Sequence, residues 1–151
     1  MSKIAVILIR GTVNLDYDRK RTLELLRLKR KFSCSVVDDT PVYRGMLEKV
    51  KDYVTYGEIE KEDFVKLLEK RGRTIGNKPV DKKVIDELTK KYFEESKIKL
   101  RDFQDYNVKP FFRLHPPIKG FERGGIKKSF NNGGALGYRG SKIKDLLNRM
   151  L

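Results

Sequence analysis

Three short apolar runs and two segments with helical spacing alternate along the first sixty residues. Lys3–Arg10 is continuous and rich in β-forming side chains, which predicts a buried central strand. Phe32–Val37 and Tyr53–Ile59 predict two further strands. Tyr17–Lys31 carries leucines three positions apart and predicts a helix, and Thr40–Pro41 is typical of the start of a second one. The pattern predicts an α+β fold in which two helices cover one face of a three-stranded sheet.

Two more helices follow in residues 61–108. The first spans Glu62–Arg71 and ends at Gly72, and the second begins after Asp81, which we expect to cap it. We therefore interpret 1–60 as a β-α-β-α-β core and 61–108 as a helical extension packed on that core.

Residues 109–151 have a different composition. Lys109–Leu114 predicts a short strand at a sheet edge, because Pro110 cannot donate to a ladder. Gly120–Gly140 mixes glycine, basic residues, amides and isolated aromatics, without an apolar run. Such a segment cannot offset its own ordering entropy, so we expect it to take shape against a partner. A last short helix, capped by Ser141, carries four apolar residues on one side: Ile143, Leu146, Leu147 and Met150.

Net charge identifies the kind of partner. The chain of 151 residues carries 35 Lys and Arg against 21 Asp and Glu, a net charge of +14. Residues 109–151 hold ten of the basic side chains and only two acids, Glu122 and Asp145. This excess of basic over acidic side chains predicts that the partner is a polyanion, whose phosphates Lys and Arg neutralise. We therefore interpret 109–151 as a basic, glycine-rich RNA-binding arm that ends in a short helix.

Residues with catalytic or metal-binding chemistry are few. The chain has one histidine, His115, beside two prolines, and one cysteine, Cys34, inside a predicted buried strand. This argues against a soft-metal site and excludes an internal disulfide. Gly133–Lys142 has the order Gly-Ser-Lys and no preceding strand, so it does not match the phosphate loop of a nucleotide-binding enzyme. We expect no enzymatic activity, no cofactor, no metal and no small-molecule substrate.

Two regions carry the side chains that suit RNA. In the loop after the first strand, glycine and small polar residues leave the backbone accessible to RNA, and a basic helix follows. For the cations of that helix, the competing interpretation is that they only form a solvated outer face. In the arm, Lys and Arg meet phosphates, while aromatic rings and Arg can stack on unpaired bases. We expect truncation of Tyr138 or Arg139 to weaken RNA binding and to leave folding stability nearly unchanged. The candidate RNA-binding residues are Arg10, Thr12, Asn14, Arg19, Lys20, Arg21, Arg44, Arg113, His115, Lys119, Phe121, Arg123, Lys127, Lys128, Phe130, Asn131, Asn132, Tyr138, Arg139 and Lys142.

Three strings in the chain carry a family resemblance. They are Lys3–Gly11, Asp39–Met46 and, most specifically, Arg113–Gly140. With these strings the chain resembles the large-subunit ribosomal protein L-thirty family, called L-seven in eukaryotes, and in particular its long archaeal-type form. The resemblance covers essentially the whole chain. It implies a three-stranded antiparallel sheet of the ferredoxin-like type backed by helices, binding to ribosomal RNA, and no catalysis.

These observations predict a structural constituent of the large ribosomal subunit that binds and stabilises ribosomal RNA. The expected partners are the RNA of that subunit and neighbouring ribosomal proteins. The alternative is a free-standing regulatory protein that binds RNA without a ribosome. No apolar run approaches the roughly 20 residues that span a bilayer, so we expect no membrane partner, and a single cysteine fits a reducing cytoplasm.

Overall fold

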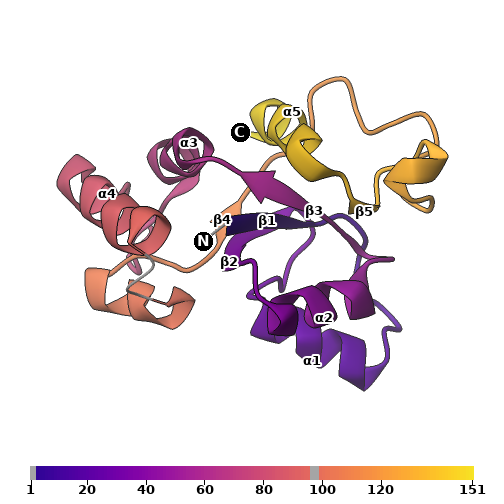
Figure 1. The fold of residues 1–151 in the computed structure, drawn as a ribbon, viewed down its shortest axis with the longest axis horizontal. Coiled ribbons are helices and arrows are strands. Elements are labelled where there is room, and N and C mark those ends of the chain that lie inside the picture. The colour runs from indigo at the N-terminus through magenta and orange to yellow at the C-terminus, as the bar shows by residue number, and fades with distance from the viewer. Residues whose placement is uncertain (1–2, 96–98) are drawn as a thin grey trace.

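One mixed sheet with the strand order β4-β2-β1-β3-β5 organises the computed structural model, which describes residues 3–95 and 99–151 (Figure 1). Its three central strands come from the first sixty residues, and its two edge strands come from residues 109–151. The strands are β1 (Lys3–Leu8), β2 (Ser33–Asp38), β3 (Val54–Ile59), β4 (Phe112–Arg113) and β5 (Gly137–Tyr138).

β1 lies at the centre of the sheet because its side chains are apolar on both faces. All six of its residues are buried, and it pairs antiparallel with β2 on one side and with β3 on the other. Cys34 of β2 is fully buried beside Ile7 of β1, so the predicted core position of this cysteine is confirmed. A strand buried on both faces requires a layer of cover on each face.

Helices provide that cover on both sides. Figure 1 shows α1 and α2 below the sheet and α3 and α5 above it. The two helices of the first sixty residues thus cover one face of the sheet, as predicted, and the segments after residue 60 supply a second layer on the other face. The helices are α1 (Tyr17–Leu25), α2 (Pro41–Val50), α3 (Lys61–Arg71), α4 (Lys82–Leu88) and α5 (Ile143–Met150).

The arm completes the sheet at both edges. β4 pairs antiparallel with β2, with Phe112 opposite Cys34, and β5 pairs parallel with β3, with Gly137 opposite Thr55. The predicted edge strand at 109–114 is thus confirmed in a shorter form. The sheet has five strands and is mixed, which corrects the expected three antiparallel strands. Strands of two residues leave no alternating pattern in a sequence, so β5 could not be predicted.

The first helix is shorter than its leucine pattern indicates. α1 ends at Leu25, well before Lys31, because Arg27 adopts a left-handed φ of 65°. The chain then turns Leu28 into the core, where it is 1% exposed. The later leucines of the pattern therefore pack from a loop rather than from a helix.

The structure confirms the predicted N-terminal cap of one helix and does not confirm the predicted caps of two others. The Thr40 hydroxyl accepts a hydrogen bond from the Tyr43 backbone N–H at 3.3 Å, which confirms Thr40 as the cap of α2. Asp81 stands at the cap position of α4 but makes no side-chain cap bond. Ser141 does not cap α5, because it lies inside a 3-10 turn, Gly140–Lys142, that precedes the helix.

The helical extension is anchored to the core by one aromatic residue. α4 continues as a π-helix that carries Tyr92 into the interior, where its hydroxyl donates to the Val36 carbonyl oxygen. The buried Lys3 ammonium lies 4.1 Å from the Tyr92 ring centre and is paired with Asp38. Burial, with the nearby Asp38 charge, holds the pKa of Tyr92 well above its ordinary value, so the phenol stays neutral.

Candidate nucleic-acid interface

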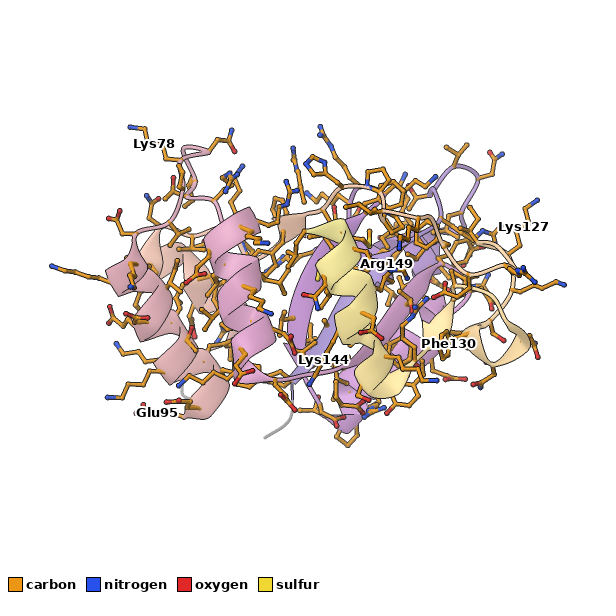
Figure 2. The ribbon with its side chains drawn as sticks, turned by 90° about the horizontal axis from the view of Figure 1, so that it is seen from above. Lys78, Glu95, Lys127, Phe130, Lys144 and Arg149 are labelled. Atoms are coloured by element: carbon orange, nitrogen blue, oxygen red, sulfur yellow. The ribbon has the colours of Figure 1, made fainter. Side chains whose placement is uncertain are left out.

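A groove of about 560 Å³ lies between the C-terminal end of α2 and the arm. The arm side contributes two lysines, two amides and two aromatic rings, and the α2 side contributes Glu48, Lys51 and Asp52. Figure 2 shows Lys127 and Phe130 together at one end of the molecule. The structure therefore gathers six of the predicted residues around this groove: Lys127, Lys128, Phe130, Asn131, Asn132 and Tyr138.

Tyr138 presents a partly open ring in the groove. Its side chain remains 46% exposed, and its hydroxyl donates to the Glu58 carboxylate at 2.7 Å. The Tyr56 ring centre lies 5.6 Å away at a tilt of 48°, and the Arg44 guanidinium lies 5.6 Å from the Tyr138 ring centre. Contacts on several sides fix the ring, while the exposed part remains available to stack on a base.

Arg44 is held by acids rather than left free for phosphate. Its guanidinium donates to both oxygens of Asp39, at 2.6 and 3.0 Å, and to Glu58 at 3.2 Å. The hydrogen bond from Arg44 lowers the pKa of Asp39 below its ordinary value. Arg44 therefore acts by positioning Glu58 and, through it, Tyr138.

Phe130 lies between two cations at the other side of the groove. The Arg139 guanidinium is 4.8 Å from its ring centre, and the Lys142 ammonium is 5.6 Å from it. Lys142 is exposed and makes no ion pair within the described residues. A phosphate bound near the ring would therefore meet the Lys142 charge.

Arg139 is an internal residue. Its side chain is 2% exposed, and it makes two hydrogen bonds to the Glu122 carboxylate, at 2.7 and 3.2 Å. It also donates to the Thr55 hydroxyl and to the Ala135 carbonyl oxygen, each at 2.8 Å. Burial alone would raise the pKa of Glu122, but the bonds from Arg139 lower it below its ordinary value. This arrangement argues against a direct contact between Arg139 and RNA.

The glycines of the arm allow the arm to fold on itself. A Cβ on Gly134 would overlap the backbone oxygen of Lys128, and the Leu136 N–H donates to that oxygen at 3.1 Å. The Phe130 N–H donates in turn to the Leu136 carbonyl oxygen at 2.7 Å. We expected glycine to give an external partner access to the backbone, but here the close partner is the chain itself. The arm therefore packs on itself and on the sheet, and its ordering by RNA stays a prediction.

The loop after β1 contacts the segment that follows α2. The backbone N–H groups of Ile9 and Arg10 donate to the Tyr53 carbonyl oxygen, at 3.0 and 3.2 Å. The Arg10 guanidinium donates to the carbonyl oxygen of Asp52, a residue that lines the groove, at 3.4 Å. The two regions indicated by the sequence therefore meet at the end of α2.

Other candidates in this region differ in availability. Thr12 and Lys20 line a separate hollow of about 200 Å³, and Asn14 is exposed with a left-handed φ of 62°. Arg19 and Arg21 form exposed ion pairs with Asp16 and Glu24 on their own helix. Such pairs are weak and compete little with phosphate.

The remaining candidates lie along the path from β4 into the arm. Arg113, His115, Lys119 and Arg123 are exposed, whereas Phe121 packs on Phe32 with ring centres 6.1 Å apart. Sequence reasoning missed the groove residues on α2 and β3, such as Lys51 and Tyr56. Their register against the arm is a long-range property that no local pattern carries.

Two findings bear on other functions. The described residues, 3–95 and 99–151, hold no cluster of three His, Cys, Asp or Glu suited to a metal ion. Within the same ranges, no helix has the length and apolar character needed to cross a membrane.

Comparison with known proteins extends over the full chain. A family model described as ribosomal protein L30p/L7e matches residues 4–54. A large ribosomal subunit protein uL30 from Methanococcus maripaludis is 49% identical over 154 residues, which cover 97% of this chain and 98% of the relative. A protein of the same description from Methanopyrus kandleri is 46% identical over 95% of this chain and 100% of the relative. Another, from Nanoarchaeum equitans, is 43% identical over all of both chains. The similarity therefore includes the arm.

Proposed function

The chain belongs to the uL30 family of large ribosomal subunit proteins, and we propose that the groove beside α2 is a principal site at which it binds ribosomal RNA. The protein is a structural constituent of the large subunit and is not an enzyme. Its partners are the RNA and neighbouring proteins of that subunit, and its place is the cytoplasm. Similarity to subunit proteins over the whole length favours this role over that of a free-standing regulator.

The division of charge across the groove supports the proposal and orients the RNA. Lys127 and Lys128 on the arm side are exposed and make no ion pair within the described residues. On the α2 side, Glu48 already holds Lys51 at 2.9 Å, and Asp52 adds a second acid. Phosphates should therefore follow the arm side, where lysines neutralise them. Bases would then point toward Tyr138.

The amides and aromatics fit single-stranded or looped RNA. Asn131 and Asn132 can donate and accept hydrogen bonds at base edges or at 2′-hydroxyls. The Tyr138 ring offers a stacking surface that is already fixed by Glu58.

The proposal gives each of three parts of the chain a role. Residues 1–60 form the core that carries the groove's α2 wall, and residues 61–108 form the extension packed on it. Residues 109–151 supply the arm side of the groove and most of its candidate RNA contacts.

Paired lysine variants test the groove. Lys127→Gln/Lys128→Gln should reduce the slope of log affinity against log salt by about 1.4–1.8, since each lost phosphate contact removes about 0.7–0.9. The matched control is Lys82→Gln/Lys83→Gln on α4, another adjacent and exposed pair. The measurement is filter binding of full-length protein to an archaeal large-subunit ribosomal RNA transcript. Equal effects of the two pairs would refute the assignment of the groove.

Tyr138→Ala tests the stacking role separately. Loss of a base–aromatic contact lowers affinity about ten- to a hundredfold. The melting temperature of the free protein should change little, because the ring is partly exposed and lies at an edge strand. A large drop in melting temperature with unimpaired RNA binding would show that Tyr138 only stabilises the fold.

A further inference from the structure

A second group of cations surrounds Phe111 at the β4 edge of the sheet. Arg71, Arg73, Lys109 and Arg113 line a hollow of about 300 Å³ on one side of the Phe111 ring. Asn77 closes this hollow and accepts a hydrogen bond from Lys109.

A second hollow of about 480 Å³ is also lined by Phe111. Arg113 lines both hollows, and Arg27, Lys29 and Arg30 complete the second. The remaining lining residues are uncharged, so neither hollow has a carboxylate in its wall. We call the cations of the two hollows the β4-edge cluster.

The β4-edge cluster is short of partners. Within the described residues, none of its cations forms an ion pair with a carboxylate. The Nε atoms of Arg27 and Arg71 are buried and have no hydrogen-bond partner there. Arg44 and Arg139, by contrast, donate several bonds to acids. Gathering like charges without acids raises the free energy of the isolated protein, and an anion bound between them lowers it.

Phe111 shapes the ligand that this cluster can take. The Lys109 ammonium lies 5.9 Å from its ring centre, and the Arg113 guanidinium lies 5.7 Å from it on a separate contact. The cations therefore line two hollows that share Phe111 and Arg113, instead of one pocket. Two adjoining groups of cations suit a polymer with repeated phosphates better than a single small anion, and arginine binds phosphate through paired donors.

The β4-edge cluster and the groove lie at opposite edges of the sheet. Strands are about 4.8 Å apart, so β4 and β5, at the two ends of a five-strand order, are separated by about 19 Å. In Figure 2, Lys78, which follows Asn77 of the cluster's first hollow in the sequence, and Lys127 of the groove stand at opposite ends of the molecule.

We propose that the β4-edge cluster binds backbone phosphates of a second segment of large-subunit RNA, so that the protein bridges two RNA segments from the two edges of one sheet. This inference rests on the proposed function, because it takes the groove as the site of the first segment. The sheet, with β1 buried on both faces, acts as a rigid spacer between them. The distance between the two segments is then set by the strand order.

The phosphate contact is tested by the salt dependence of binding to the same RNA transcript. Arg73→Gln/Lys109→Gln/Arg113→Gln should lower the log–log slope by about 2–3, while Lys82→Gln/Lys83→Gln/Lys90→Gln, at exposed lysines of α4 and of the π-helix that continues it, should not. Arg73→Lys/Arg113→Lys keeps the charge and should retain most of the slope, which separates lost charge from lost folding. If this cluster's variant matches the α4 control while the Lys127/Lys128 variant still lowers the slope, the further inference fails and the proposed function stands. If the Lys127/Lys128 variant also has no effect, the proposed function fails as well.

The second segment is identified by tethered hydroxyl-radical cleavage. Cys34 is fully buried, so a thiol-reactive iron chelate attaches selectively to an introduced cysteine. In subunits assembled with Lys78→Cys or Lys127→Cys protein, we expect cuts in two RNA segments that are separate in sequence. Coincident cuts, or no RNA cuts from position 78, would overturn the bridge. Unchanged binding of the triple variant to bare RNA, with reduced incorporation into subunits, would instead assign the β4-edge cluster to an acidic protein and overturn the RNA assignment.

Discussion

Arg139 joins three segments that are far apart in the chain. Its guanidinium bonds to Glu122 in the arm, to Thr55 on β3 and to the Ala135 carbonyl oxygen. The Thr55 hydroxyl in turn donates to the Gly137 carbonyl oxygen at 2.9 Å. This buried network fixes the arm to the sheet, so the effect of Arg139 on RNA binding should be exerted through the position of Tyr138 beside it.

Arg139→Ala should therefore destabilise the free protein, contrary to the expectation from sequence. Removing the guanidinium leaves the partly exposed Glu122 carboxylate and the Thr55 and Ala135 oxygens without its hydrogen bonds, which costs about 1–3 kcal/mol of unfolding free energy. Arg139→Lys should lie between wild type and Arg139→Ala, since lysine cannot bond both Glu122 oxygens and Thr55 in one plane. Urea unfolding gives the values. Arg123→Ala, an exposed arginine of the same arm, should change the stability by no more than about 0.5 kcal/mol.

The same network makes the arm sensitive to acid. The pKa of Glu122 is lower in the folded protein than its ordinary value of 4.5, so the unfolded state binds the proton more tightly. The stability that Glu122 contributes is complete well above pH 4.5 and is lost as the pH falls below it toward the folded-state pKa.

Melting temperatures of wild type and Glu122→Gln should differ at pH 7 and converge below pH 4.5. Asp145→Asn, at an exposed carboxylate without an ion pair in the described residues, should show no such convergence. A gap between wild type and Glu122→Gln that widens toward low pH would contradict the lowered pKa.

At the level of elements, the contact between β3 and the turn before α5 decides whether the arm docks. A Cβ on Gly57 would overlap the backbone oxygen of Gly140 and press on Ile143. α5 then buries Ile143, Leu146, Leu147 and Met150, and it packs on β3 of the sheet. A glycine in the middle of a strand is unfavourable by itself, so its presence here reflects the close approach of the arm.

Gly57→Ala should lower the unfolding free energy by about 1–3 kcal/mol, because a backbone oxygen cannot turn aside as a side chain can. Hydrogen exchange should also accelerate at the Arg139 amide, which is bonded to the Tyr56 carbonyl oxygen at 2.9 Å. Gly45→Ala in α2 is the matched control. Its added methyl group meets nothing within 4 Å, so it should stabilise the protein by about 0.5–1 kcal/mol. Slow exchange at Arg139 in Gly57→Ala would show that the approach is not tight.

Elements with long apolar runs were predictable, and those defined by distant pairing were not. β1, Thr40 at the start of α2 and the apolar side of α5 follow from local patterns. β5 and the burial of Arg139 depend on the pairing of the arm with β3. That pairing is a long-range contact, and the local sequence of the arm does not indicate it. The groove shows the same division, because the lysines and rings of its arm side were predicted and its residues near α2 and on β3 were not.

For the whole molecule, the net charge of +14 makes salt act in opposite directions on folding and on binding. Unpaired cations repel one another in the free protein, and added salt screens that repulsion. Salt also weakens RNA binding through counterion release.

The melting temperature of free protein should therefore rise between about 20 and 300 mM NaCl, whereas RNA affinity falls over the same range. Differential scanning fluorimetry and filter binding provide the two curves. The buried Arg139–Glu122 pair should contribute little to the rise, since buried pairs are screened less. A falling melting temperature would indicate that surface ion pairs, not repulsion, dominate the charge balance.

The parallel pairing of β5 with β3 also has a consequence for biosynthesis. Thr55 and Gly137 lie 82 positions apart in the chain. At about 5–20 residues per second, a translating ribosome adds Gly137 about 4–16 s after Thr55. During that interval the nascent chain carries β3 with one row of peptide groups unpaired, and such an edge is prone to join strands of other chains. The glycine-rich arm, translated last, is the segment that closes this edge and ends the period of risk.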